Sequence, residues 1–430
     1  MDGTGYIGQG SAQGVLSSRE VAEICAAAVE AWRPDGRRLL LLVPDQSRTC
    51  PLDHIFRVLY PQLAGRAKAL DFMVALGTHP PLSQGQIYRR FGITAEEHRR
   101  AFPRARFLNH AWQKREELVE VGQIPEAEIR ELTGGRFEME VAVTCNRRVR
   151  EYDLLVIVGP VFPHEVVGFS GGNKYLFPGI GGPEIINFFH WLGAVITSPV
   201  VIGNMWTPVR RVVDRAAGMV PVERQALCMV VRDHALAGLY AGKPEAAWAA
   251  AVELSRQVHI RYFDRPFHTV LSCAPEMYAD LWTAGKCMYK LEPVVADGGR
   301  LIIYAPHVRE FSVTHGAVIR AVGYHIRDFF LSQWERYRSH PWGVLAHCTH
   351  VKGIGSFAGD VERPRIEVVL ATGIPETECR AVNLGFLDYR TVRPADYEGR
   401  ESEGVLCVPR AGEILYRWKN APPALGGKSP

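Results

Sequence analysis

The stretch RRLLLLVPD, from Arg37 to Asp45, contains a run of five apolar residues that ends at Pro44 and Asp45. A short apolar run that stops at a turn signal is typical of a strand buried on both faces of a parallel sheet. The segment just before it, residues 17–32, has apolar residues at helical spacing. A helix followed by a buried strand is a unit of α/β sheets, and we expect the unit to recur.

The same alternation of patterns continues along the chain. Apolar runs predict strands, and apolar residues at three- and four-residue spacing predict helices. Strands alternating with helices predict the fold class α/β, with largely parallel sheets flanked by helices. Further strands are predicted within residues 70–83, 152–163, 268–275 and 298–307, and further helices within residues 94–102, 183–195, 212–219 and 236–258.

The length of the chain predicts more than one domain. Its 430 residues exceed the usual size of a single domain. A new series of strands begins after the Ala-rich helix and YFDRPF, so we place a boundary near residue 265. This gives an N-terminal α/β domain, residues 1–265, and a C-terminal α/β domain, residues 266–430. We expect the active site in the cleft between them.

The composition excludes several classes of protein. With 47% hydrophobic and 22% charged residues, the chain is expected to be globular rather than disordered. Its 50 basic and 46 acidic residues give a net charge of only +4, which argues against a nucleic-acid partner. No apolar run approaches the length of a membrane span, and no signal peptide is evident, so we expect a cytoplasmic protein. The nine cysteines are scattered singly, which predicts reduced thiols.

Several polar side chains follow the predicted strands directly. Asp45 and Arg48 come after the first strand, His79 after the second, and His164 after the strand in residues 152–163. Because ligands bind at the carboxyl ends of parallel strands, these residues are candidates for a functional site.

The segment FPHEVVGFSGGNKYLFPGIGGPEIINFFHWLG, Phe162 to Gly193, combines glycines with a lysine and two histidines. Glycines such as Gly171 and Gly172 adopt positive φ and admit a ligand close to the backbone. The segment is not a Walker loop, because Lys174 is followed by tyrosine, and no G-x-G-x-x-G follows the first strand. Taken singly, a glycine-rich turn, a lone lysine or a lone histidine is more often structural than functional.

Taken together, the motifs resemble the lactate racemase family of nickel-pincer nucleotide enzymes. The resemblance rests on the spacing His164-x9-Lys174-x15-His190, with PDQSR at Pro44 to Arg48 and GTH at Gly77 to His79 in support. It implies that the cofactor, pyridinium-3,5-bisthiocarboxylic acid mononucleotide nickel, is attached covalently to Lys174, with His190 as the fourth nickel ligand. Accessory cofactor-biosynthesis proteins would have to build and load this group.

The resemblance also implies roles for the other candidates. His79 and His164 correspond to the two acid–base histidines, one for each enantiomer of a 2-hydroxy acid, and Arg48 and Lys286 to the cations that contact the substrate. Asp45 either orients Arg48 or contacts the cofactor, and Gly171 and Gly172 make room for it. The residue-level alternatives are that Arg48 caps a strand end and that Lys286 is an ordinary lysine on a helix surface.

Some positions depart from the family pattern. Pro80 and Pro81 follow the GTH histidine where relatives usually have arginine, and Thr283 stands where they usually have glutamine. His110 lacks the acid that tends to follow it, so we assign it no role. The substrate contacts are therefore altered, which favours a larger or more hydroxylated 2-hydroxy acid, such as a sugar acid, over lactate.

Two other classes of function are kept as alternatives. The first is a zinc-dependent hydrolase or lyase with His79, His164 and His190 as ligands, although the chain has no H-E-x-x-H motif. The second is a non-catalytic protein that binds an anionic metabolite. The residues favour a racemase or epimerase over both, and they predict no oligomeric state.

Overall fold

The computed structural model describes residues 5–420. The chain forms two compact units and passes between them five times. Unit 1 contains the chain up to Phe162 together with residues 169–186 and 208–258, and unit 2 contains residues 163–168, residues 187–207 and the chain from His259 onward. We predicted a domain boundary near residue 265 and placed His164 and His190 in the N-terminal domain; both histidines belong to unit 2.

A seven-stranded sheet forms the centre of unit 1. Five neighbouring strands are parallel, and two antiparallel strands complete one edge. In sheet order the strands are β1 (Tyr6–Gly10), β11 (Ala235–Gly242), β10 (Glu223–Arg232), β7 (Leu154–Pro160), β2 (Arg38–Val43), β3 (Ala69–Val74) and β4 (Ala105–Asn109). The predicted buried strands β2, β3 and β7 are therefore confirmed.

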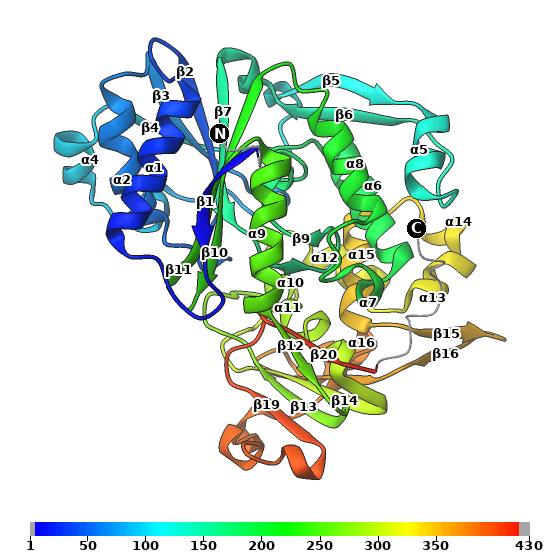
Figure 1. The fold of residues 1–430 in the computed structure, drawn as a ribbon. Helices are drawn as coiled ribbons and strands as arrows, with labels where there is room; N and C mark the ends of the chain where they lie inside the picture. The colour runs from blue at the N-terminus through cyan, green and yellow to red at the C-terminus, as the bar shows by residue number, and fades with distance from the viewer. Residues whose placement is uncertain (1–4, 421–430) are drawn as a thin grey trace. The chain divides into compact units, whose positions relative to one another are not determined.

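Helices cover both sides of this sheet (Figure 1). The helices α1 (Ser18–Trp32) and α2 (Leu52–Ala64) lie on one side and pack their apolar residues on β2 and β3, while α9 (Pro244–His259) lies on the other. The helix α1 begins at a capping box in which Ser17 and Glu20 satisfy each other's backbone N–H groups. The remaining elements are α3 (Gln84–Arg90), α4 (Ala95–Ala101), α5 (Glu126–Thr133), α8 (Pro208–Ala217), β5 (Leu118–Ile124) and β6 (Val141–Asn146).

One sequence prediction was wrong. Residues 236–258 were predicted to be a single helix, but residues 235–242 form β11 and only the segment from Pro244 onward is helical. The strand β11 pairs with β10 on one side and β1 on the other, so backbone pairing overrides a local pattern of small apolar residues. Proline then starts α9, because its missing N–H is not needed in the first helical turn.

Unit 2 is built on a five-stranded sheet whose strands are all parallel. In sheet order they are β18 (Gly385–Phe386), β17 (Glu367–Thr372), β14 (Val295–Ala305), β13 (Phe267–Cys273) and β19 (Val405–Val408). The predicted strands β13 and β14 are confirmed. Two small sheets are added: β12 (Ile260–Phe263) pairs with β20 (Leu415–Trp418), and β15 (Gly355–Ala358) pairs with β16 (Val361–Pro364).

The helices of unit 2 follow the strands. The longest that lies wholly within the unit is α15 (Trp342–Lys352), whose residues from Gly343 onward are buried. The predicted helix α6 (Pro183–Ile196) is confirmed and carries His190. The others are α7 (Ser198–Val201), α10 (Leu281–Ala284), α11 (Lys286–Tyr289), α12 (Gly316–Val322), α13 (Arg327–Ser332), α14 (Trp334–Tyr337) and α16 (Glu376–Ala381). Within residues 5–420, no helix is long and apolar enough to cross a membrane.

Candidate functional site

The strand order of unit 1 marks a site at the carboxyl ends of β2 and β7. From β2 the chain continues to β3 and β4 on one side, whereas from β7 it continues to β10 on the other. The two central strands therefore flank a topological switch point, where the connections leave in opposite directions and open a crevice for a ligand. Asp45 and Arg48 follow β2, so they lie where such a ligand binds.

Asp45 is paired with His79 across two loops. The Asp45 side chain is buried and accepts hydrogen bonds from the Ser47 N–H at 3.0 Å and the Ser47 hydroxyl at 2.8 Å. Its second carboxylate oxygen contacts His79 Nδ1 directly. A carboxylate at Nδ1 holds the ring proton there and leaves Nε2 of the neutral ring free to accept a proton. That Asp45 orients Arg48 or contacts a cofactor stays a prediction; the structure adds its contact with His79.

The loop that carries His79 also contacts the segment after Lys174. Gly77 donates its backbone N–H to the carbonyl of Gly179 at 3.0 Å. Burial is the main factor that raises the pKa of Tyr175, and Cys50 and Asp45 raise it further while Arg48 and Arg90 oppose the shift. These electrostatic interactions weaken with distance, so the groups that shift the pKa of Tyr175 lie near its hydroxyl. Unit 1 thus brings the loops of Asp45, Arg48 and His79 beside the segment that begins at Lys174.

Side chains from α8 and α9 fix the loop that precedes Lys174. Arg210 donates to the carbonyl of Phe169 at 2.6 Å, and Trp248 donates to that of Ser170 at 2.9 Å. The Asn173 amide donates to Asp214 at 3.0 Å and to Glu245 at 2.7 Å. Burial raises the pKa of Asp214. The loop is therefore tied to two helices through a buried polar network, while the Lys174 side chain remains partly exposed.

The glycines before Lys174 have a packing reason within unit 1. Gly171 has a φ of +83°, and a Cβ there would lie 2.6 Å from Val161 Cγ2. Gly172 has a φ of +56°, and a Cβ there would lie 3.0 Å from the Trp248 side chain. Glycine is thus required at both positions by backbone conformation and by protein neighbours. Their contact with a cofactor stays a prediction.

The Nδ1 atom of His164 faces a backbone N–H donor, whereas Nδ1 of His79 faces a carboxylate. Its side chain is buried in unit 2, and its Nδ1 accepts the backbone N–H of Val166 at 3.1 Å. Glu165 Oε2 lies 3.3 Å from the same nitrogen. A ring nitrogen that accepts from a backbone N–H carries no proton in that geometry, so the neutral His164 ring has its proton on Nε2. The roles of His79 and His164 as acid–base groups stay a prediction.

His190 belongs to a group of aromatic and imidazole rings in unit 2. Its ring stacks on that of Phe189, with centroids 4.9 Å apart. Burial lowers the pKa of His347 well below its usual range, and the nearby His350, His315 and His190 lower it further. Sequence reasoning missed His347 and His350 and predicted no helix there; the available signal was two histidines three residues apart in AHCTH, which α15 places on one face.

Lys286 is buried, not a surface lysine. It follows β13, from which the chain continues to β14 on one side of the sheet while β19 lies on the other, so it stands at the switch point of unit 2. Its ammonium lies 4.7 Å from the centroid of the Tyr278 ring. One helical turn earlier, Trp282 contacts the rings of His315 and His347 at centroid distances of 4.4 Å and 4.3 Å. Lys286 is thus buried against the Tyr278 ring, one helical turn after the contacts of Trp282 with two histidine rings.

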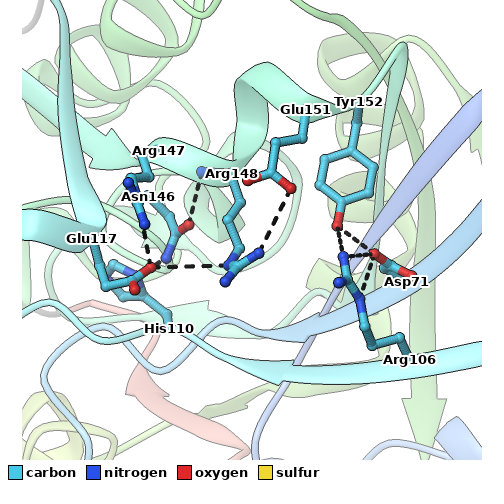
Figure 2. A network of polar contacts seen from close by, with 9 residues as sticks. All are labelled: Asp71, Arg106, His110, Glu117, Asn146, Arg147, Arg148, Glu151 and Tyr152. Atoms are coloured by element: carbon cyan, nitrogen blue, oxygen red, sulfur yellow. Dashed lines mark hydrogen bonds and ion pairs between the residues drawn. The ribbon is translucent and has the colours of Figure 1, made fainter.

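His110 proves to be structural. Its Nε2 bonds to the carbonyl of Gly181 at 2.8 Å, and its Nδ1 bonds to the Asn146 amide at 3.3 Å. Figure 2 shows it beside Asn146, whose side-chain oxygen accepts the Arg148 N–H; Arg148 in turn pairs with Glu117, which also pairs with Arg147. Burial lowers the pKa of His110 to about 4. Both ring nitrogens are occupied by protein groups, which accounts for its burial.

A metal site made only of protein ligands is not found in residues 5–420. No group of three or more His, Cys, Asp or Glu side chains is placed there to hold a metal ion. All nine cysteines are free, as predicted, and most are buried.

Comparisons with known proteins identify similar sequences and structures. A family profile described as "Lactate racemase N-terminal domain" matches residues 19–200, which include Lys174 and His190. Lactate racemase from Thermoanaerobacterium thermosaccharolyticum is 24% identical over 277 residues, which cover 63% of this chain and 60% of that protein. Lactate racemase from Lactiplantibacillus plantarum is 23% identical over 304 residues, which cover 67% of this chain and 66% of that protein.

Two solved structures resemble the whole chain. A protein from Thermotoga maritima is 31% identical, with a TM-score of 0.87, and the match covers 96% of this chain and all of that one. The lactate racemase apoprotein from Thermoanaerobacterium thermosaccharolyticum is 18% identical, with a TM-score of 0.69 and coverage of 92% and 93%. The latter likeness concerns the fold. With the profile match and the motifs around Lys174, these findings show that the chain belongs to the lactate racemase family.

Proposed function

We propose that this protein inverts the C2 stereocentre of a 2-hydroxy carboxylate. The observation that carries the proposal is a pair of histidines whose Nδ1 atoms are held by protein groups: Asp45 contacts Nδ1 of His79, and the Val166 N–H is donated to Nδ1 of His164. Racemisation requires one group that takes the hydroxyl proton from one enantiomer and a second that gives a proton to the oxygen of the other, with the roles exchanged in the reverse direction. The family supports the same activity, because its named relatives are lactate racemases.

The residues around Lys174 and His190 fit a nickel-pincer nucleotide. Lys174 has a primary amine suited to a covalent link, and it stands on a fixed loop with its side chain partly exposed. His190 offers an imidazole, a suitable fourth ligand for Ni(II) in a planar site. When bound, this group would supply a reversible acceptor for the C2 hydride. Accessory proteins that build and load it are part of the proposal.

The chain's own residues would handle the proton and the charge. In one direction Nε2 of His79 takes the hydroxyl proton as the C2 hydride leaves, which yields a planar 2-keto acid. In the other half of the reaction the hydride returns to the opposite face, and His164, protonated on both ring nitrogens with Nδ1 beside Glu165, gives its Nε2 proton to the oxygen and becomes neutral. Arg48 would bind the substrate carboxylate, and Lys286 would stabilise negative charge on the C2 oxygen.

The substrate is proposed to be larger or more hydroxylated than lactate. The exposed Pro80 and Pro81 stand after His79, where relatives usually have an arginine. Thr283 stands where relatives usually have glutamine, and its N–H and hydroxyl donate hydrogen bonds to the Asp280 carboxylate at the start of α10. Trp282, His315 and His347 offer ring faces and ring nitrogens near Lys286, which suit a polyhydroxylated chain such as that of a sugar acid.

The test is a stereochemical screen of cofactor-loaded protein. Purified protein, co-expressed with the cofactor-building proteins of a relative, is incubated with single enantiomers of 2-hydroxy acids of increasing length, and both C2 epimers are separated by chiral chromatography. We expect equilibration of at least one acid, and none with Lys174→Ala. Inversion that is undiminished in Lys174→Ala contradicts the mechanism, and loaded protein that equilibrates no acid contradicts the activity.

A further inference from the structure

A cavity lies wholly within unit 2. Its volume is about 470 Å³, a size common among small-molecule sites. Glu292, Asp297 and Arg365, which lie at or just before the beginnings of β14 and β17, are part of its wall. Those strand beginnings form the amino edge of the parallel sheet, whereas Lys286 follows the carboxyl end of β13. This part of the wall therefore lies at the opposite edge of the sheet from the strand end that precedes Lys286.

The wall of this cavity contains buried polar atoms without hydrogen-bond partners. Glu292 is fully buried; one of its oxygens accepts the Ile354 N–H at 2.8 Å, and the other has no partner among the described residues. Three other groups of the wall are also buried without a hydrogen-bond partner among the described residues: the Thr349 hydroxyl, both ring nitrogens of His350, and the Ser198 hydroxyl. Native proteins leave few buried polar groups unpaired, so their concentration around one cavity indicates a polar occupant.

Most of the charged groups in the cavity wall have partners of opposite charge, but one arginine has none among the described residues. Arg327 is paired with Asp328 at 2.7 Å, and Arg365 is paired with Asp297 at 3.1 Å. The exposed Arg363 stands in the wall with no hydrogen bond or ion pair from its guanidinium within residues 5–420. Burial raises the pKa of Glu292, against the opposing effect of Arg365, and burial lowers the pKa of His350 to about 4. The cavity thus combines one cation at its rim with buried polar groups deeper inside.

We propose that this cavity binds a small hydroxylated oxyanion, whose anionic group pairs with Arg363 and whose hydroxyls bond to Glu292, Thr349 and His350. A guanidinium recognises carboxylate and phosphate alike, and neutral groups that both donate and accept suit hydroxyls. A polyhydroxy carboxylate and a sugar phosphate share this chemistry. The proposal does not depend on the activity at Lys174.

The test is a binding measurement on the full-length apoprotein by isothermal titration calorimetry. Gluconate and glucose 6-phosphate are the two oxyanion probes, and sorbitol and sodium chloride are the controls for hydroxyls and for ionic strength. The titration is made in Lys286→Gln protein, so that binding at the proposed catalytic site is suppressed. We expect saturable binding of at least one oxyanion, and which one binds identifies the source of the anion.

Three variants in that background locate the site. Arg363→Gln should weaken binding at least tenfold, and Thr349→Val, which removes an unpaired hydroxyl, should weaken it while leaving the ligand-free melting temperature unchanged or higher. Arg99→Gln, an exposed arginine in unit 1, changes the net charge equally and should bind like its parent. Absence of saturable oxyanion binding, equal binding of sorbitol, or binding indifferent to Arg363→Gln would each overturn the proposal.

Discussion

At the scale of single residues, the contact between Asp45 and His79 explains why a carboxylate stands in the PDQSR motif. The carboxylate fixes the ring proton on Nδ1, so a change that keeps the shape of Asp45 but removes its charge should allow the wrong tautomer. We expect Asp45→Asn to lower kcat by about 10²–10⁴-fold, the range that general acid–base catalysis contributes. The adduct on Lys174 should be unaffected.

Ser47→Ala is the matched control for this prediction. It removes one hydrogen bond to the same carboxylate at 2.8 Å but leaves the charge in place. A neutral hydrogen bond contributes about 1 kcal/mol, so kcat should fall by less than about tenfold. Comparable kcat values for Asp45→Asn and the parent protein, measured across a range of pH, are incompatible with the assignment of His79 as a base held by Asp45.

Because burial lowers the pKa of His110, we expect the free energy of unfolding to depend on pH. This pKa is about 4 in the folded protein and is near 6.5 when the chain unfolds. Between these values the unfolded chain binds the proton and the folded one does not, so this contribution to stability is complete above about pH 6.5 and is lost as the pH falls towards 4. In urea titrations, His110→Gln should reduce the slope of unfolding free energy against pH in this window by up to about 1.4 kcal/mol per pH unit. An unchanged slope contradicts the prediction.

At the scale of elements, the sequence predicted the buried strands well because their apolar runs are continuous and end at turn residues. It failed at residues 235–242, where the pattern Ala-Leu-Ala-Gly-Leu-Tyr has no decisive periodicity and pairing with β10 and β1 determines the structure. The loop before Lys174 was identified as special from its glycines, but the reason was not. Contacts with Trp248 and Val161, which no pattern within the loop reveals, require glycine there.

This packing gives a prediction for the loop that carries Lys174. Gly171→Ala should destabilise the protein by about 2–4 kcal/mol, because it adds a clash with Val161 to the strain of a positive φ. Gly36→Ala is the control: its φ is +68°, but a Cβ would meet nothing within 4 Å, so only about 1–2 kcal/mol should be lost. Chemical denaturation measures both. Equal losses in the two variants contradict the packing argument.

At the scale of the whole molecule, the sequence predicted the fold class and the family but not how the chain is divided. A boundary in sequence is visible only where a composition or pattern changes, whereas the short segments 163–168 and 187–207 join unit 2 through packing that no local pattern reveals. The same holds for the site. The family resemblance predicted the site residues His79, His164, Lys174, His190 and Lys286. The side chains that surround them, such as Trp248 and His347, come from distant segments of the chain.

The central claim is that Lys174 carries a nickel-containing cofactor that makes this chain a 2-hydroxy acid racemase or epimerase. The most direct test is intact-protein mass together with nickel analysis on protein co-expressed with cofactor-building proteins, for the natural chain and for Lys174→Ala. We expect a mass increment and about one nickel per chain in the former, which a single planar site requires, and neither in the latter. An unmodified, nickel-free natural chain, under loading conditions that succeed for a relative, would contradict the claim.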